Sequence, residues 1–121
     1  MARWRLSELA EADLADILAT SRERWGIDGR RRYATLVVAA LRMVAADPEG
    51  PGTRASADLL AGVRSLHLRH ARATAPKPTT QRPVHILYFR RSRPGLIDIL
   101  RVLHERMEPS RHVGPGPEED V

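Results

Sequence analysis

Two apolar stretches near the end of the chain, Ile86–Phe89 and Leu96–Leu103, are separated by the turn residues Pro94 and Gly95. Proline presets φ at the first corner of a tight turn, and glycine accepts the positive φ needed at the second. The pattern therefore predicts a β-hairpin with two largely buried strands. The apolar pattern stops at the end of the second stretch, and a polar segment, residues 104–112, follows.

Apolar residues recur at helical spacing in two earlier stretches, which are separated by Gly26. The first begins after Ser7, a candidate helix cap, and the second begins after Asp28, another candidate cap. A run of Asp, Pro and Gly at 47–52 ends the second stretch. We expect an antiparallel αα-hairpin whose apolar stripes face the core. The stripe residues are Ala10, Leu14, Ile17, Leu18, Ser21 and Trp25, then Tyr33, Leu36, Val37, Ala40, Leu41 and Val44, with Trp25 and Tyr33 as core anchors.

The remaining segments are short or broken by proline. Residues 4–6 have the composition of a short strand, and residues 63–71 alternate between apolar and polar side chains with the period of a half-buried strand. We expect loops at 48–62 and 73–83, the second of them long and mobile. The last residues, 114–121, contain two prolines, two glycines and three acids, which favour a disordered acidic tail.

The predicted element order is strand, helix, helix and three strands. Short connections favour an antiparallel meander for the last three strands, and the two helices then cover one face of it. This order predicts an α+β fold, a two-layer sandwich with the arrangement β-α-α-β-β-β. A chain of 121 residues suffices for one modest core, so we expect a single domain over residues 1–113.

The charge is carried almost entirely by arginine. Lysine and arginine total 20 and acidic residues 15, which gives a net charge of +5, and Lys77 is the only lysine. Arginine binds carboxylates and phosphates in a bidentate manner, so this surface suits an acidic protein as well as nucleic acid. The chain lacks cysteine and any apolar run of membrane-spanning or signal-peptide length. We expect a soluble, cytoplasmic protein that does not associate with membranes.

Five segments, taken in order, resemble the ParE branch of the RelE/ParE superfamily of type II toxin–antitoxin systems. The most specific is IDILRVLHERMEPSRHV at 97–113, although Glu108 stands where an aspartate is usual. The WG pair in RWGIDGRRRY, residues 24–33, is the next most specific. The other segments are LSELAEADLADI at 6–17, GVRSLHLRH at 62–70 and HILYFR at 85–90.

The resemblance implies a toxin that poisons DNA gyrase and is neutralised by a ParD-like antitoxin in a hetero-oligomeric complex. Specific DNA binding by the toxin alone is not expected. Relatives in the RelE branch instead cut messenger RNA on the ribosome, with lysines and arginines on the core strands. Here Ser65 and His67 stand where lysines are usual, and His85 stands where an arginine is usual. These differences favour the gyrase-directed activity over an enzymatic one.

Two alternatives remain open from the residues. The first is a ribosome-dependent mRNA interferase, an endoribonuclease in which Arg64, Arg90 and His112 would be catalytic, because such chemistry needs cations and a proton-transfer group at the phosphate. The second is an inactive relative that only binds its antitoxin. Neither a cofactor nor a metal is expected, because the five histidines lie on different predicted elements without a supporting carboxylate pattern.

Candidate contact residues follow from the resemblance and from charge. For the target these are Arg101, His104, Arg106, Met107, Arg111 and His112, in and after the last strand. For the antitoxin, Arg64 and Arg90, with Arg101 on the same sheet face, are expected to grip an acidic segment, and Arg31 at the start of the second helix is a further candidate. Structural alternatives are a hydrogen bond from His104 to a backbone carbonyl and a gap-filling role for Met107.

Overall fold

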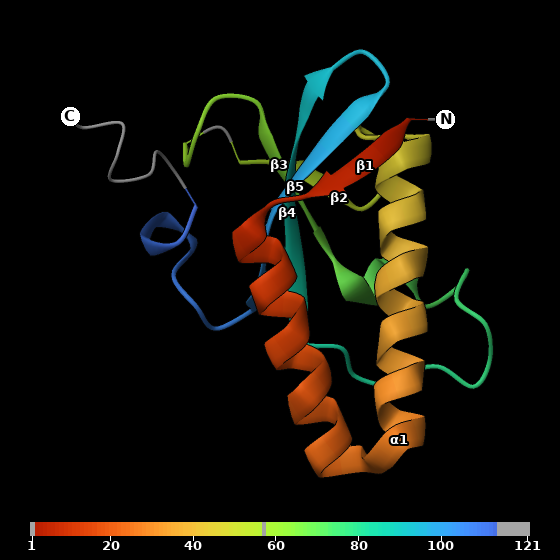
Figure 1. Ribbon diagram of the computed structural model, residues 1–121. Helices are drawn as coiled ribbons and strands as arrows, with labels where there is room; N and C mark the ends of the chain where they lie inside the picture. The colour runs from red at the N-terminus through yellow and green to blue at the C-terminus, as the bar shows by residue number, and fades with distance from the viewer. Residues whose placement is uncertain (1, 57, 114–121) are drawn as a thin grey trace.

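The computed structural model describes residues 2–56 and 58–113, and the expected tail at 114–121 lies outside them. The chain forms a five-stranded sheet with a long bent helix on one face, which confirms the predicted α+β fold (Figure 1). The elements are β1 (Arg3–Leu6), α1 (Glu8–Ala46), β2 (Thr53–Ala55), β3 (Val63–His67), the 3-10 helix η1 (Leu68–Ala71), β4 (His85–Arg93), β5 (Leu96–His104) and the 3-10 helix η2 (Pro109–Arg111).

The helix α1 is bent at Gly26 into two arms that run in opposite directions, as the predicted αα-hairpin requires (Figure 1). Gly26 has φ 76° and ψ −174°, a backbone conformation that side chains with a Cβ atom strongly disfavour. The Ser7 hydroxyl caps the first arm by accepting a hydrogen bond from the Ala10 amide at 3.0 Å. The sequence pattern therefore located the Ser7 cap and the bend correctly.

The sheet has the order β1-β5-β4-β3-β2. Strands β3, β4 and β5 pair antiparallel, which confirms the predicted meander, and Gly95 (φ 82°) lies in the turn between β4 and β5. The N-terminal strand β1 pairs in parallel with the first half of β5. Because β1 is short, the second half of β5 lies beyond it, and this part of the edge contacts α1 instead.

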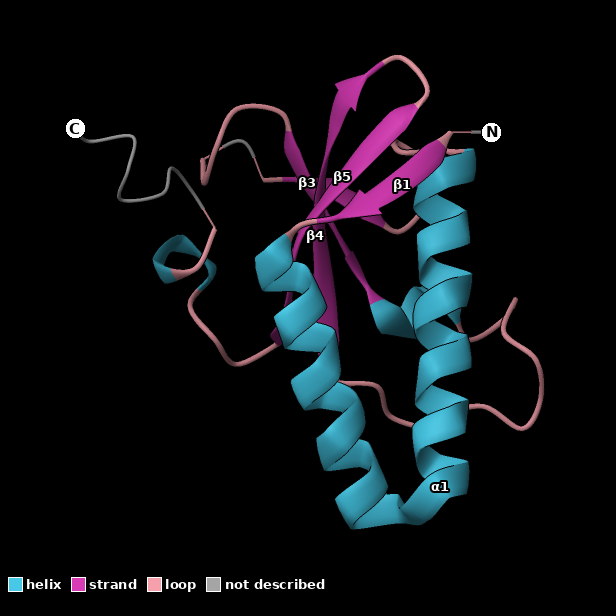
Figure 2. Cartoon of the chain, viewed as in Figure 1, coloured by secondary structure: helices cyan, strands magenta, loops and turns pink. Residues whose placement is uncertain are grey.

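The main core lies between α1 and one face of the sheet (Figure 2). All six predicted stripe residues of the second arm are buried there, against Leu66, Leu87, Phe89, Ile97, Ile99 and Val102 of the sheet. A smaller cluster on the opposite face contains Val63, Tyr88, Leu103 and Val113. The segment after β5 thus returns over the outer face of the sheet and buries Val113 against it.

Three expectations about local structure are wrong. The strand expected at 63–71 ends at His67, whose side chain accepts a hydrogen bond from the Arg69 amide at 3.1 Å and caps η1. The segment expected to be a loop at 48–62 contains β2, which pairs with β3 at the edge of the sheet. Trp25 is 70% exposed, because the tip of the hairpin extends beyond the end of the sheet (Figure 2).

The loop at 73–83 packs against the rest of the protein. Ala75 is 5% and Thr79 9% exposed, and the Arg72 guanidinium donates a hydrogen bond to the Thr80 carbonyl at 2.9 Å. None of the helices in residues 2–56 and 58–113 has the length and apolar character needed to cross a bilayer.

Candidate functional site

The segment that follows β5 exposes most of the residues expected to contact a target. Arg106, Met107, Arg111 and His112 are all exposed, and Met107 is 47% exposed. The segment is anchored at both ends, because the Glu105 amide donates a hydrogen bond to the Val84 carbonyl at 2.7 Å and Val113 is buried. Two exposed arginines, Arg106 and Arg111, are therefore presented on a segment that is fixed at both ends.

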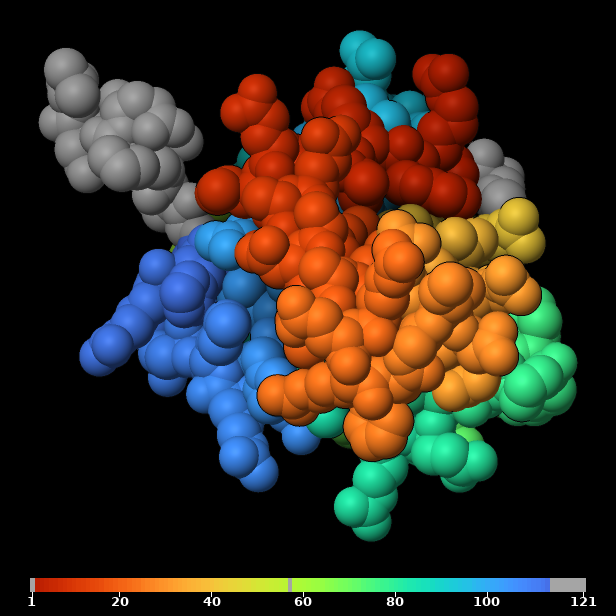
Figure 3. All heavy atoms as spheres, turned by 60° about the horizontal axis from the view of Figure 1, so that its bottom comes forward, coloured from red at the N-terminus to blue at the C-terminus, as the bar shows by residue number. Residues whose placement is uncertain are grey.

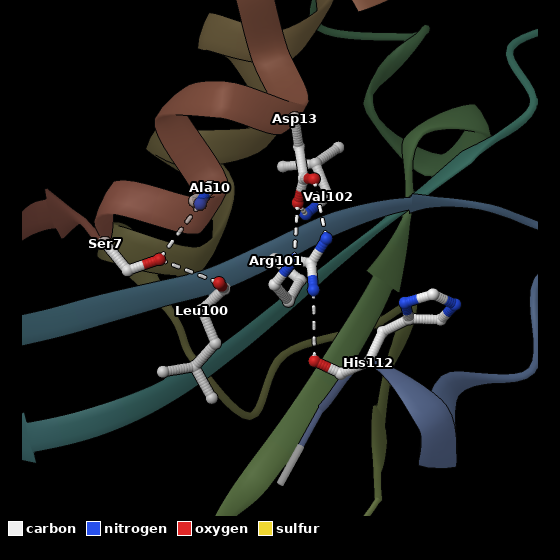
Figure 4. A network of polar contacts seen from close by, with 7 residues as sticks. All are labelled: Ser7, Ala10, Asp13, Leu100, Arg101, Val102 and His112. Carbon is white, nitrogen blue, oxygen red and sulfur yellow. Dashed lines mark hydrogen bonds and ion pairs between the residues drawn. The ribbon is translucent and has the colours of Figure 1, made fainter. Parts of the chain in front are cut away.

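Arg101, in contrast, is held in a network with the first arm of α1 (Figure 4). Its Nε and Nη2 atoms donate to the two carboxylate oxygens of Asp13, each at 2.8 Å, and both side chains are less than one-fifth exposed. Its Nη1 atom donates to the His112 carbonyl at 3.2 Å. The bidentate contact raises the pKa of Arg101 above its ordinary value. Arg101 thus joins the helix, the sheet and the segment after β5.

The same carboxylate covers the part of the β5 edge that β1 does not reach. The Val102 amide donates to Asp13 at 2.9 Å, and the Ser7 hydroxyl donates to the Leu100 carbonyl at 2.8 Å (Figure 4). A β-bulge at this point leaves Leu100 unpaired with β4, because Tyr88 lies opposite Arg101 and Phe89 opposite Ile99. Sequence reasoning missed Asp13, since nothing in the helical period of α1 indicates an acceptor for a strand edge.

His104 lies in a cluster of rings at the end of the sheet. It is paired with His85 across β4 and β5, with ring centroids 5.6 Å apart, and His85 contacts Tyr33 of α1 through Nδ1 and the phenol oxygen at 2.5 Å. Burial is the main cause that lowers the pKa of His85 to about 4 and raises the pKa of Tyr33 to about 12. His85 is therefore neutral at physiological pH.

The other predicted residues lie on separate surfaces. Arg64 lies opposite Phe89 on the helix-covered face, where it donates to the Pro48 carbonyl at 3.1 Å and to the Thr53 hydroxyl at 2.8 Å. Arg90 lies opposite Val63 on the outer face. The expectation that Arg64, Arg90 and Arg101 share one face is wrong. Side chains alternate between the two faces along a strand, and this alternation places Arg64 on the helix-covered face and Arg90 on the outer face. Arg31 is exposed on the second arm, 3.9 Å from the Asp28 carboxylate.

A groove of about 750 Å³ opens between the two arms of α1. Its walls come from both arms, the loop residues 79–84, the ends of β4 and β5 at His85 and His104, and Met107. In the space-filling view from this end, the hairpin tip (orange) lies between the loop (green) and the segment after β5 (blue) (Figure 3). Within the described part of the chain, no cluster of three or more His, Asp or Glu side chains is placed to hold a metal ion.

Comparison with known sequences relates this chain to a class of toxins. A family model described as the ParE toxin of the type II toxin–antitoxin system parDE matches residues 4–109. The chain is 34% identical over 115 residues to the protein named Toxin ParE1 from Caulobacter vibrioides, covering 94% of this chain and 100% of that relative. It is 31% identical over 111 residues to Toxin ParE1 from Mycobacterium tuberculosis, covering 92% and 97% of the two chains.

The chain belongs to the ParE toxin family of type II toxin–antitoxin systems. Membership in this family implies an antitoxin partner in a toxin–antitoxin complex. The family model extends through β5 and the turn after it, so the surface that carries Arg106 and Met107 belongs to the matched region.

Proposed function

We propose that this protein inhibits bacterial growth by poisoning DNA gyrase in the cytoplasm, and that a ParD-like antitoxin neutralises it. The observation that carries the proposal is the match to the ParE toxin model over residues 4–109. In this mechanism the toxin acts by contact with the topoisomerase, and its own side chains perform no bond-breaking step.

The proposed contact surface is the exposed segment after β5. Arg106 and Arg111 extend into solvent there, while Glu108 is occupied within the segment, accepting hydrogen bonds from the Ser110 amide and hydroxyl. Exposed guanidinium groups can engage phosphates or carboxylates of a cleavage complex in a bidentate manner. Arg101 and His104 act through the frame that positions this segment, since both are engaged in internal contacts.

The arrangement of the ribonuclease candidates also supports the proposal. Arg64 and Arg90 lie on opposite faces of the sheet, and Arg64 is bound to Pro48 and Thr53. Ribonuclease chemistry requires cations and a proton-transfer group around one phosphate. Side chains on opposite faces do not meet that requirement together with His112.

For the antitoxin, we propose that Arg90 and Arg31 contribute to separate parts of an extended interface. Arg90 lies on the outer face of the sheet, and Arg31 lies on the second arm of α1. An antitoxin that places a helix and an extended segment over the toxin can reach both surfaces. Charge-assisted contacts of this kind mainly set association rate and specificity.

A paired assay on toxin released from its antitoxin tests the proposed activity. Supercoiling by gyrase is measured beside cleavage of messenger RNA on translating ribosomes, at the same toxin concentrations. We expect inhibition of supercoiling with intact messenger. Messenger cleavage with normal supercoiling would overturn the proposal in favour of an interferase, and no effect in either assay would indicate an inactive relative.

A further inference from the structure

The groove between the arms of α1 combines apolar walls with several hydrogen-bond donors. Arg24 and Arg32 extend from the two arms, and Arg82 extends from the loop. Guanidinium groups donate hydrogen bonds and do not accept them. Three such groups from three segments surround one opening, so the groove favours a ligand that carries negatively charged oxygen atoms.

The two histidines of the groove add further donors. The His104 Nδ1 atom accepts a hydrogen bond from the Arg106 amide at 3.1 Å, which leaves the proton of the neutral ring on Nε2. The Tyr33 oxygen accepts from the Val84 amide at 3.3 Å and uses its own proton toward His85 Nδ1 at 2.5 Å. The proton of neutral His85 therefore also lies on Nε2. Both rings present an N–H group at the remaining nitrogen.

A buried hydroxyl in the same groove has no partner. Thr79 is 9% exposed and lines the groove, and its Oγ1 atom makes no hydrogen bond within the described part of the chain. Buried polar atoms are nearly always hydrogen-bonded in folded proteins, because an unsatisfied one costs free energy. The Oγ1 atom itself has almost no accessible surface, so the Thr79 side chain must rotate about χ1 before a ligand in the groove can supply the missing partner.

Two other side chains on the groove walls indicate a ligand with more chemical groups than a simple anion has. Trp25 is 70% exposed and lines the groove, although it is the largest side chain of the hairpin tip. Exposed tryptophan beside arginine is a typical stacking surface for a nucleobase. Asp16 supplies a carboxylate acceptor, which suits a ribose hydroxyl or a base amino group and disfavours a ligand that is anionic throughout.

We propose that this groove is a nucleotide-binding site. The phosphate lies among Arg24, Arg32 and Arg82, and the base lies against Trp25. A volume of about 750 Å³ is of the size that small-molecule ligands occupy in proteins. The groove adjoins the segment after β5 at Met107 but includes neither Arg106 nor Arg111, and its occupancy can be tested without the topoisomerase.

The probe is adenosine monophosphate, titrated into the full-length toxin by calorimetry and by NMR of the two tryptophan indole groups. We expect saturable binding in the micromolar to millimolar range, with a shift of the Trp25 signal and little change at Trp4, which lies in the sheet. Inorganic phosphate and adenosine, which each carry half of the ligand, are expected to bind at least about tenfold more weakly. Equal affinity for phosphate and the monophosphate would contradict the role of Trp25.

Two variants and a control distinguish a site from a merely structural feature. Arg82→Ala is expected to weaken binding about tenfold, and Thr79→Val about fivefold, since each removes one ligand hydrogen bond. Thr79→Val should fold at least as stably as the parent protein, because it removes an unpaired buried hydroxyl. Arg30→Ala, an exposed change on the same hairpin outside the groove, should leave affinity unchanged.

The proposal is overturned if no saturable binding appears at 10 mM, on the order of the weakest affinities that calorimetry resolves. It is also overturned if both variants bind like the parent protein. A glutamate octapeptide that binds the groove while the nucleotide does not would show that the cationic lining serves an acidic protein segment.

Discussion

A single carboxylate, Asp13, connects α1 to the open edge of β5. It accepts two hydrogen bonds from Arg101 and one from the Val102 amide. We expect Asp13→Ala to lower the free energy of unfolding by about 2 kcal/mol, because a mostly buried guanidinium and a strand amide lose their partner. Chemical denaturation measures the change.

The matched control is Asp28→Ala, which removes a carboxylate of the same helix. Asp28 is highly exposed and lies 3.9 Å from Arg31, so this change should cost no more than about 0.5 kcal/mol. Equal effects of the two substitutions would show that the network around Arg101 contributes nothing to stability.

His85 links stability to pH. Its pKa in the folded protein is about 4 against an ordinary value of 6.5, mainly because of burial and then because of His104. Between these pH values His85 is protonated in the unfolded chain and neutral in the folded chain. The contribution of this residue to stability is therefore fully present above pH 6.5 and is lost as the pH falls toward 4. Allowing for partial solvent screening, we expect a loss of about 2 kcal/mol from this residue.

The measurement compares the free energy of unfolding of the parent protein and His85→Gln at pH 7 and pH 4.5. Glutamine can accept the Tyr33 hydrogen bond and does not titrate, so the variant should lose less stability on acidification. Identical pH dependence in the two proteins would assign the effect to another group, such as Glu105, whose pKa is lowered by its hydrogen bond with His67.

At the scale of elements, the bend in α1 depends on Gly26. No side chain lies within 4 Å of the position that a Cβ atom would occupy there, so the cost of a substitution comes from the backbone alone. We expect Gly26→Ala to destabilise the protein by about 1–2 kcal/mol, since φ is 76° and ψ is −174°. Thermal unfolding beside Glu23→Ala, an exposed change in the adjacent turn, checks this; similar midpoints would contradict the assigned strain.

Elements with strong local patterns could be predicted from the sequence. The second arm of α1 and the β4–β5 hairpin have a clear period and clear turn residues, and their buried residues match the pattern. The parallel pairing of β1 with β5 joins segments more than 90 residues apart and leaves no local signal. β2 is only three residues long and follows a run rich in proline and glycine, so the sequence pattern indicated a loop there.

The candidate site could be predicted only where its residues are consecutive in the sequence. Residues 104–112 were identified because they follow one another after a strand. Tyr33 and His85 are 52 positions apart, and their contact depends on how the helical hairpin packs on the sheet. Trp25 fits the helical period, yet periodicity does not reveal that the hairpin extends beyond the sheet.

At the scale of the whole molecule, the proposed activity depends on two exposed arginines, Arg106 and Arg111, in a segment that is anchored to the rest of the protein at both ends. We expect the double variant Arg106→Glu and Arg111→Glu to weaken inhibition of supercoiling by at least about tenfold, because charge reversal opposes contact with an anionic surface. The fold should be intact, since both side chains are exposed. Inhibition is measured as the toxin concentration that halves the supercoiling rate.

The double variant Arg91→Glu and Arg93→Glu is the matched control, with two exposed charge reversals at the far end of β4. It should inhibit like the parent protein. An equal loss in this control would mean that net charge, and not the segment after β5, determines the potency.

The most direct test of the account is the detection of covalent gyrase–DNA cleavage complexes in cells that express the toxin. Plasmid DNA is recovered after denaturation and protease treatment, with and without coexpression of the antitoxin. We expect linearised plasmid to accumulate with the toxin alone and to disappear when the antitoxin is present. Growth arrest without linearised plasmid would contradict gyrase poisoning as the activity of this ParE toxin.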